Sequence, residues 1–199
     1  AGLADGIPGL SCTVLGPSRL QKMGAGALLA VARGSDEPPR MIVLRYRPAA
    51  PARPGEVLGL VGKAVTFDSG GISIKPSSGM EEMKMDMGGG AAVILATALI
   101  ARLGLPVEVL AVVPATENMP SGRALKPGDV LTAMNGRTVE VINTDAEGRL
   151  ILADALAYAA REGATRMIDL ATLTGATVLP LGEVYPGLCG PAEDFTGLV

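Results

Sequence analysis

Short apolar runs alternate along the chain with longer segments of helical length. Residues 41–46, 57–61 and 107–113 are rich in Val, Ile and Leu, and Pro114 follows the third run. Runs of this length and composition predict buried strands. A proline-rich turn at residues 48–54 separates the first two strands, and we expect Pro114 to close the third.

Three segments have the length and composition of helices. Residues 88–103 contain no proline, and residues 149–161 consist of good helix formers. Residues 10–31 predict a helical connection that leads toward the first strand.

The later part of the chain predicts a hairpin and one more strand. The dipeptide Asn135-Gly136 favours a tight turn between residues 129–131 and 138–142. Residues 167–170 predict a strand that leads into a turn at residues 171–175.

The alternation of strand and helix indicates the α/β class, with a largely parallel central sheet between helices. In such sheets, ligands bind where loops leave the carboxyl ends of the strands. Three polar segments follow predicted strands: residues 63–75, 116–126 and 143–149. We therefore expect the candidate chemistry to gather at one edge of the sheet.

The composition narrows the class of protein. Hydrophobic residues make up 48% of the 199 residues, which is typical of a globular chain. The longest apolar run, residues 91–101, is shorter than the ~20 residues that a membrane-spanning helix needs, so we expect no membrane span. A net charge of −3, scattered basic residues and only 3% aromatic residues argue against nucleic acid as a partner.

The absence of histidine excludes several enzyme classes. Neither a Ser-His-Asp triad nor a Cys-His pair can form, so Ser69 is a poor candidate for a nucleophile. A histidine-rich zinc site is also excluded, and a bound metal must rely on carboxylates, carbonyls, water or a lysine. Cys12 and Cys189 match no metal-binding or redox spacing, and we interpret them as reduced thiols of a cytoplasmic protein.

Asp145, Glu147 and Arg149 occupy alternate positions just before an apolar helical segment. In an extended segment this spacing would place all three side chains on one side. Two carboxylates in that arrangement suggest a divalent cation. The alternative is a solvated loop that caps its own helix.

Further charged residues lie among apolar residues and glycines: Lys63, Asp68 and Lys75 in one segment, and Asp86 in another. Such charges are costly to bury unless they pair or bind a ligand. For the first segment, the alternative is a simple Lys63–Asp68 ion pair. For the second, the alternatives are an Asp86 charge favoured by the dipole of the following helix and a phosphate-binding glycine loop, which would require a lysine that the segment lacks. Together with the two acids above, these carboxylates would repel one another without a cation, which predicts a two-metal centre with Lys63 as a further ligand.

These segments resemble motifs of the leucyl aminopeptidases, or cytosol aminopeptidases, of the M17 peptidase family. The resemblance extends over residues 16–190 and is most specific at residues 61–76, 83–86, 117–122, 126–129 and 143–150. It implies a three-layer α/β/α fold of the zinc-exopeptidase type, with a mixed, largely parallel sheet. Residues 1–40 would be a connecting helix and entry segment, and residues 41–199 a partial catalytic domain that lacks the family's N-terminal domain and C-terminal part.

The resemblance also implies roles for individual residues. The tighter metal ion would be held by Lys63, Asp68, Asp86 and Glu147. The more exchangeable ion would be held by Asp68, Glu147 and Asp145, the last also through its backbone carbonyl. Lys75 and Arg149 match the two catalytic positions, and Arg149 would hold a bicarbonate ion that serves as general base. The matching substrate-binding positions are Met83, Asn143, Thr172, Leu173 and Gly175.

The implied activity is that of a metalloaminopeptidase that releases N-terminal residues, preferably leucine and other apolar ones, from peptides by metal-activated water. Zinc is the default metal, and manganese, cobalt or magnesium also suit a carboxylate-rich site. Family members are cytoplasmic and form hexamers. Two alternatives are a catalytically silent or truncated subunit that acts through assembly, and a DNA-binding role as in some bacterial relatives, which the acidic balance disfavours.

Overall fold

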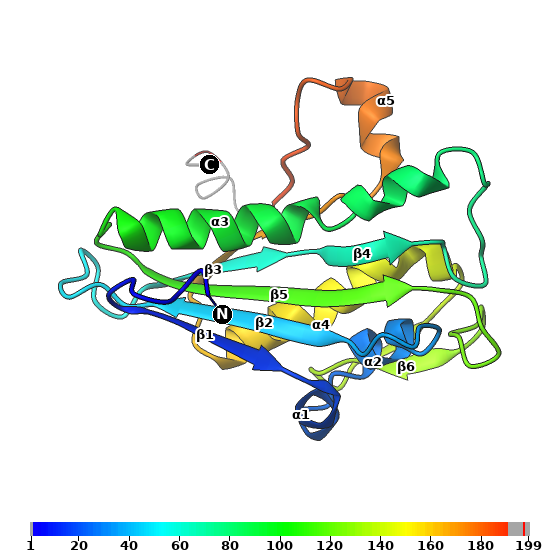
Figure 1. Ribbon diagram of the computed structural model, residues 1–199, viewed down its shortest axis with the longest axis horizontal. Helices are drawn as coiled ribbons and strands as arrows, with labels where there is room; N and C mark the ends of the chain where they lie inside the picture. The colour runs from blue at the N-terminus through cyan, green and yellow to red at the C-terminus, as the bar shows by residue number, and fades with distance from the viewer. Residues whose placement is uncertain (1, 191–196, 198–199) are drawn as a thin grey trace.

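The computed structural model describes residues 2–190 and residue 197. Its main sheet has six strands, which are β1 Leu10–Leu15, β2 Arg40–Tyr46, β3 Val57–Gly62, β4 Ala64–Asp68, β5 Glu108–Asn118 and β8 Arg166–Leu170. A small second sheet pairs β6 Val130–Thr132 with β7 Thr138–Glu140. Figure 1 shows the main sheet with one long helix, α3, along its upper side.

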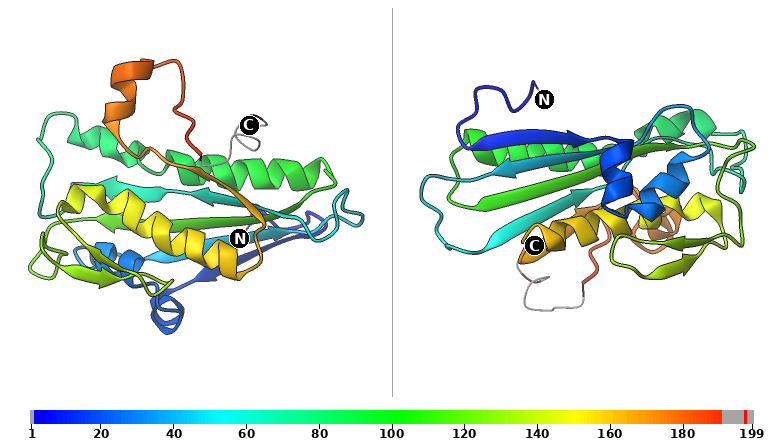
Figure 2. Two further views of the ribbon diagram at one scale, coloured as in Figure 1. Left: turned by 180° about the vertical axis from the view of Figure 1, so that it is seen from behind. Right: turned by 90° about the horizontal axis from the view of Figure 1, so that it is seen from below.

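The described helices are α1 Pro17–Lys22, α2 Gly26–Ala32, α3 Gly88–Arg102, α4 Glu147–Arg161 and α5 Val178–Leu181. α2, α3 and α4 pack on the two faces of the main sheet. Three 3-10 turns lie at Met80–Met85, Thr144–Ala146 and Gly175–Thr177. Figure 2 shows α3 on one face and α4 on the other, where α2 also packs. This arrangement confirms the predicted α/β class and its three layers.

The main sheet is mixed, as predicted. Its strand order is β1-β2-β5-β3-β8, and β4 also pairs with β5. β1 and β2 are antiparallel to their neighbours, whereas β3, β4, β5 and β8 run in one direction. β3 pairs with the first half of β5 and β4 with its last residues, because the chain interrupts the ladder at Lys63. This interruption forms one side of the site described below.

Alternate residues of β5 face the two helical layers. Leu110 and Val112 pack in a cluster with residues of α2 and α4. Val109, Ala111 and Val113 pack in a second cluster with residues of α3. All five side chains are buried, so the continuous apolar run forms a strand covered on both faces. The core thus lies on both sides of β5 and fixes the position of its carboxyl end.

Most predicted elements are present within one to two residues of their expected bounds, including the hairpin, but residues 10–31 do not form a continuous helical connection. Residues 10–15 are strand β1, which pairs antiparallel with β2 along its whole length. Leu10 and Cys12 pack on the core at the two-residue period of a strand. Pro17 then begins α1, as is common in the first helical turn. Cys12 and Cys189 are free thiols.

The prediction that Pro114 closes its strand is wrong, since β5 continues to Asn118. Pro114 lies between Val112, the last residue paired with β3, and Ala115, the first paired with β4. The missing N–H of the proline therefore coincides with the break in the neighbouring strand, where the ladder loses little. As a consequence, residues 116–118 belong to the strand and not to the loop after it.

Two features near the site also differ from expectation. The sequence pattern does not predict β4, because Thr66 and Asp68 interrupt its apolar residues. The polar segment at residues 143–149 follows the small β6–β7 hairpin instead of a strand of the main sheet. It reaches the site through hydrogen bonds to the loop after β4, such as that from Thr144 Oγ1 to Gly70 O at 2.7 Å.

Residues Met80–Arg102 are long and apolar enough to cross a membrane. Length and composition are the only basis for this assignment, and core helices meet the same criterion. The segment is divided between a 3-10 turn and α3, and Gly89, Val93 and Ala98 of α3 are buried. We therefore interpret α3 as a layer of the α/β/α fold.

Candidate metal centre

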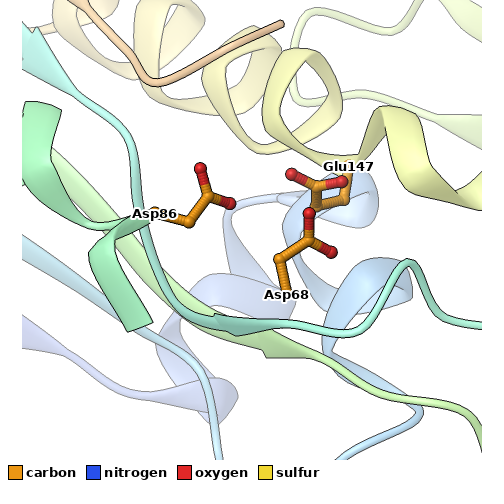
Figure 3. A group of neighbouring side chains, drawn as sticks. All are labelled: Asp68, Asp86 and Glu147. Carbon is orange, nitrogen blue, oxygen red and sulfur yellow. The ribbon is translucent and has the colours of Figure 1, made fainter. Parts of the chain in front are cut away.

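Three carboxylates converge at the carboxyl ends of β4 and β5. Asp68 ends β4, Asp86 lies between a 3-10 turn and α3, and Glu147 is the first residue of α4. One oxygen of each lies within 4.8 Å of the others, and all three residues are buried. Figure 3 shows the three carboxylates pointing toward one another. Burying three acids together requires cations or protons nearby.

Lys63 supplies the first cation. It lies at the break between β3 and β4, where its backbone N–H bonds to Leu170 O and its carbonyl accepts from Gly90 N. Its ammonium lies 2.7 Å from Asp86 Oδ1 and 2.9 Å from Glu147 Oε1, and it donates to Thr172 O at 2.9 Å. The three hydrogens of the ammonium thus each have an acceptor.

Glycines give Lys63 and Asp86 room to meet. A Cβ at Gly62 would lie 2.7 Å from Gly89 O and 2.7 Å from Gly90 Cα, so only glycine lets α3 begin this close to the strand. A Cβ at Gly148 would lie 2.9 Å from Lys63 Cε and 3.0 Å from its Nζ. The first turns of α3 and α4 therefore pack closely against the segment at Lys63 because these positions lack side chains.

Lys75 supplies the second cation. Its ammonium lies 2.9 Å from Asp68 Oδ2 and 2.5 Å from Asp145 Oδ1. The loop turns back on itself to bring Lys75 there, with a positive φ of 86° at Gly70 and a hydrogen bond from Lys75 N to Ser69 O at 2.9 Å. The Lys75 side chain is 21% exposed, so it faces the open side of the cluster.

The excess negative charge of the cluster and its burial both favour the binding of cations. Four carboxylates face two ammonium groups, which leaves two negative charges unmatched. Asp86 Oδ2 is buried and has no hydrogen-bond partner among the described residues. An unpaired buried oxygen next to excess negative charge fits a metal ligand. The described residues therefore fit a site for hard divalent cations with oxygen ligands and one amine.

The pKa values follow from the same geometry. Burial raises the pKa of Glu147 and the pKa of Asp86, although Lys63 opposes both shifts. Burial lowers the pKa of Lys63, but the neighbouring Glu147 and Asp86 outweigh it, so the net shift of this pKa is upward. Burial likewise lowers the pKa of Lys75, and Asp145 and Asp68 outweigh it. Lys63, Lys75, Asp86 and Glu147 therefore bind their protons more tightly than the free side chains do.

The structure corrects two sequence interpretations. Residues 144–146 form a 3-10 turn and Glu147 begins α4, so this segment is not extended and its alternate spacing is not what gathers the side chains. Lys63 does not form a simple pair with Asp68 either. It pairs with Asp86 and Glu147, while Asp68 pairs with Lys75.

The remaining candidate residues lie around this cluster. Thr172 Oγ1 donates to Asp86 Oδ1 at 2.6 Å, and Asn143 accepts from Asp145 N at 2.9 Å as the cap of the 3-10 turn. Arg149 is exposed in the first turn of α4, and no ion pair involves it among residues 2–190. Of the three other candidate positions, Met83 is half-buried, and Leu173 and Gly175 are exposed.

Sequence reasoning gave no role to one residue at the centre of the cluster. Asn118 ends β5 and is 4% exposed, and its side-chain amide donates to Asp68 Oδ1 at 2.8 Å. Its only sequence signal is its place in the motif at residues 117–122. A neutral side chain in a polar motif does not reveal which acids it contacts until the strands are placed.

Comparisons with known proteins show what the chain is similar to. The model of the cytosol aminopeptidase family, catalytic domain, matches residues 3–198. A protein of Solibacter usitatus named "Probable cytosol aminopeptidase" is 62% identical over 90% of the chain, and one of Alkaliphilus oremlandii with the same name is 52% identical over 94%. The chain spans only 37% of the length of each of these curated relatives.

Solved structures show the same fold. The bottromycin maturation enzyme BotP in complex with Mn is 48% identical, with a TM-score of 0.83 over 91% of this chain and 39% of that chain. A second structure of BotP is 49% identical, with a TM-score of 0.81. The similarity thus extends over nearly all of the chain.

Proposed function

The chain belongs to the cytosol aminopeptidase family, and we propose that its carboxylate cluster binds two divalent metal ions in a protein that releases N-terminal amino acids from peptides. One observation carries this proposal: Asp68, Asp86 and Glu147 converge in a buried site with more carboxylates than ammonium groups. The Mn complex of the similar enzyme BotP supports the choice of a divalent ion.

The family resemblance implies which residues hold each ion, and the contacts of the two lysines with the four carboxylates are compatible with these ligand sets. The tighter ion would be held by Lys63, Asp68, Asp86 and Glu147. The more exchangeable ion would be held by Asp68, Glu147 and Asp145, whose backbone carbonyl would be a further ligand. Oxygen-rich sites of this kind accept zinc, manganese, cobalt or magnesium. The amine of Lys63 must lose its proton before it can become a ligand.

Two bound divalent ions would supply Lewis acidity, which polarises a peptide carbonyl and makes water more acidic. Lys75 stands on the open side of the cluster, where its ammonium would stabilise the negative oxygen that develops on the attacked carbonyl. Arg149 is exposed one helical position beyond Gly148, and we propose that it holds a bicarbonate ion as general base. Such a base would replace the histidine that the sequence lacks.

The substrate would be a peptide with a free α-amine. Met83 and Leu173 offer an apolar wall for the first side chain, which favours leucine and other apolar residues. By the family resemblance, Asn143, Thr172 and Gly175 would line the substrate cleft, and Thr172 and Asn143 contact the proposed ligands Asp86 and Asp145. For the whole protein we propose a cytosolic location and a hexamer of identical subunits.

A second candidate function is a catalytically silent subunit that binds metal and acts through assembly. It deserves a test because the chain spans 37% of the length of its relatives. A DNA-binding role is disfavoured by the net charge of −3.

Two measurements on the same preparation test the proposal. Anomalous scattering or metal analysis counts the ions in the cluster, and hydrolysis of leucine p-nitroanilide with added Mn²⁺ or Zn²⁺ reports the activity. Two ions with turnover support the full proposal, whereas metal without turnover supports the silent subunit. A chain that binds no divalent metal would overturn both.

A further inference from the structure

Asn118 makes contacts that no ligand or catalytic role accounts for. Its Nδ2 lies 2.8 Å from Asp68 Oδ1, 3.0 Å from Thr144 O and 3.4 Å from Glu147 Oε2. Two of these acceptors belong to proposed metal ligands, and the third is the carbonyl that precedes Asp145. Because all three neighbours are acceptors, the NH₂ group and not the amide oxygen must face them.

The two acids divide their oxygens between a lysine and this amide. Asp68 gives Oδ2 to Lys75 and Oδ1 to Asn118. Glu147 gives Oε1 to Lys63 and Oε2 to Asn118. Asn118 therefore bridges Asp68 and Glu147 through the carboxylate oxygens that the two ammonium groups do not contact.

We propose that Asn118 is a positioning residue that holds the carboxylates of Asp68 and Glu147 at the separation and orientation that a shared divalent cation requires. This inference rests on the proposed metal-binding function. A neutral amide suits the role because it donates hydrogen bonds without adding positive charge. A lysine or arginine at this position would orient the acids equally well but would compete electrostatically with the metal.

The surroundings hold the amide in place. β4 and β5 pair Asp68 with Asn118, and Ser69 bonds to the Asn118 carbonyl through its N–H at 3.0 Å and its hydroxyl at 2.7 Å. A Cβ at Gly71 would lie 2.8 Å from Asn118 Oδ1, so glycine leaves the space for the amide oxygen. Ser69 thus fixes the backbone of Asn118, and glycine at position 71 leaves room for its amide oxygen.

The third acceptor ties the two ligand-bearing loops together. Thr144 is 1% exposed and offers its carbonyl to Asn118, while its hydroxyl donates to Gly70 O at 2.7 Å and accepts from Ser73 N at 2.8 Å. Thr144 N in turn donates to Ser73 Oγ at 3.1 Å. Asn118 therefore reaches both acids and the segment that places Asp145.

Variants of Asn118 in the full chain test the proposal through metal affinity. Asn118→Leu keeps the approximate shape and removes the donor, and Asn118→Ser retains one shorter donor. Mn²⁺ affinity, measured by isothermal titration calorimetry, should fall about 10- to 100-fold in the leucine variant, as for other residues that orient metal ligands, and less in the serine variant. Asn135→Ala, which changes an exposed asparagine in the hairpin, should leave the affinity unchanged.

A second measurement separates positioning from general destabilisation. The thermal unfolding of each metal-free variant is compared with its Mn²⁺ affinity and with the electron paramagnetic resonance spectrum of the bound ion. A positioning role predicts lower affinity and an altered spectrum in variants that remain folded. Unchanged affinity and spectrum in folded Leu and Ser variants would overturn the inference while leaving the proposed function intact. Failure of the unaltered chain to bind Mn²⁺ would overturn both.

Discussion

Gly148 leaves the space that the end of the Lys63 side chain occupies, since a Cβ there would lie 2.9 Å from Lys63 Cε. The helix that carries Glu147 can approach Lys63 only because its second residue has no side chain. The contact of 2.9 Å between Lys63 Nζ and Glu147 Oε1 depends on this approach. The position of the Lys63 side chain thus depends on glycine at position 148, although 85 positions separate the two residues in the sequence.

Gly148→Ala should therefore weaken metal binding. The added methyl group must displace Lys63 or the start of α4, at a cost of about 1–3 kcal/mol for overpacking. We expect Mn²⁺ affinity to fall on the order of tenfold, measured by calorimetry. Gly122→Ala is the matched control, because no atom lies within 4 Å of a Cβ there. Equal affinities of the two variants would contradict the role of Gly148.

Metal affinity should increase with pH. The pKa of Lys63 and the pKa values of Glu147 and Asp86 are all raised in the metal-free protein, and a metal ion binds these groups only after they lose their protons. Each displaced proton should raise the apparent affinity about tenfold per pH unit below the pKa of the group. Calorimetry in buffers of different ionisation enthalpy counts the released protons. An affinity that stays constant between about pH 6 and 8 would contradict this linkage.

Lys75→Ala should reduce turnover while the metal content persists. The proposed ligands include no atom of Lys75, but its ammonium lies where it can stabilise developing negative charge. Loss of one such stabilising group typically lowers kcat about 10²- to 10³-fold. Leucine p-nitroanilide hydrolysis and metal analysis on the same sample check the expectation, with Lys22→Ala on the exposed part of α1 as control. Unchanged turnover would remove the role assigned to Lys75.

The sequence predicts those strands whose apolar pattern is uninterrupted. β2, β3 and β5 are continuous runs, so burial on both faces is visible without knowledge of their neighbours. The six residues of β1 fit the period of a helix as well as that of a strand, and pairing with β2 decides between the two. The sequence also does not show that the strand continues past Pro114. The proline is tolerated because the pairing partner of β5 changes there from β3 to β4.

The site was predictable in its residue types and not in its pairings. The acids and lysines among glycines indicated a cation site, and the structure gathers Asp68, Asp86 and Glu147 in one buried cluster. Which lysine meets which acid depends on the strand break at Lys63 and the loop after β4, neither of which has a local signal. For the same reason, the spacing of residues in the sequence does not predict tertiary hydrogen bonds such as those of Asn118.

A buried aspartate on α4 should matter for stability. Asp154 is 0% exposed and accepts hydrogen bonds from Leu28 N at 2.9 Å and Met134 N at 2.7 Å, so it ties α2 and the hairpin to the helix that carries Glu147. Asp154→Ala leaves two buried N–H groups without partners, which should cost about 2–5 kcal/mol of unfolding free energy. Urea unfolding checks this value, with the exposed Asp5→Ala as control. A loss no larger than that of the control would contradict it.

The contribution of Asp154 should also depend on pH in a defined direction. Burial raises the pKa of Asp154 above 3.8, although the hydrogen bonds from Leu28 and Met134 oppose the shift. A raised pKa in the folded state means that the contribution is fully present below the unfolded pKa and declines as pH rises through the folded pKa. The unfolding free energy of the unaltered chain minus that of Asp154→Asn should therefore fall as pH rises from 3.8, because the asparagine does not titrate. Urea unfolding of both proteins at several pH values measures this difference, in which the titration of all other groups cancels. A difference that grows with pH would show that the hydrogen bonds outweigh burial at Asp154.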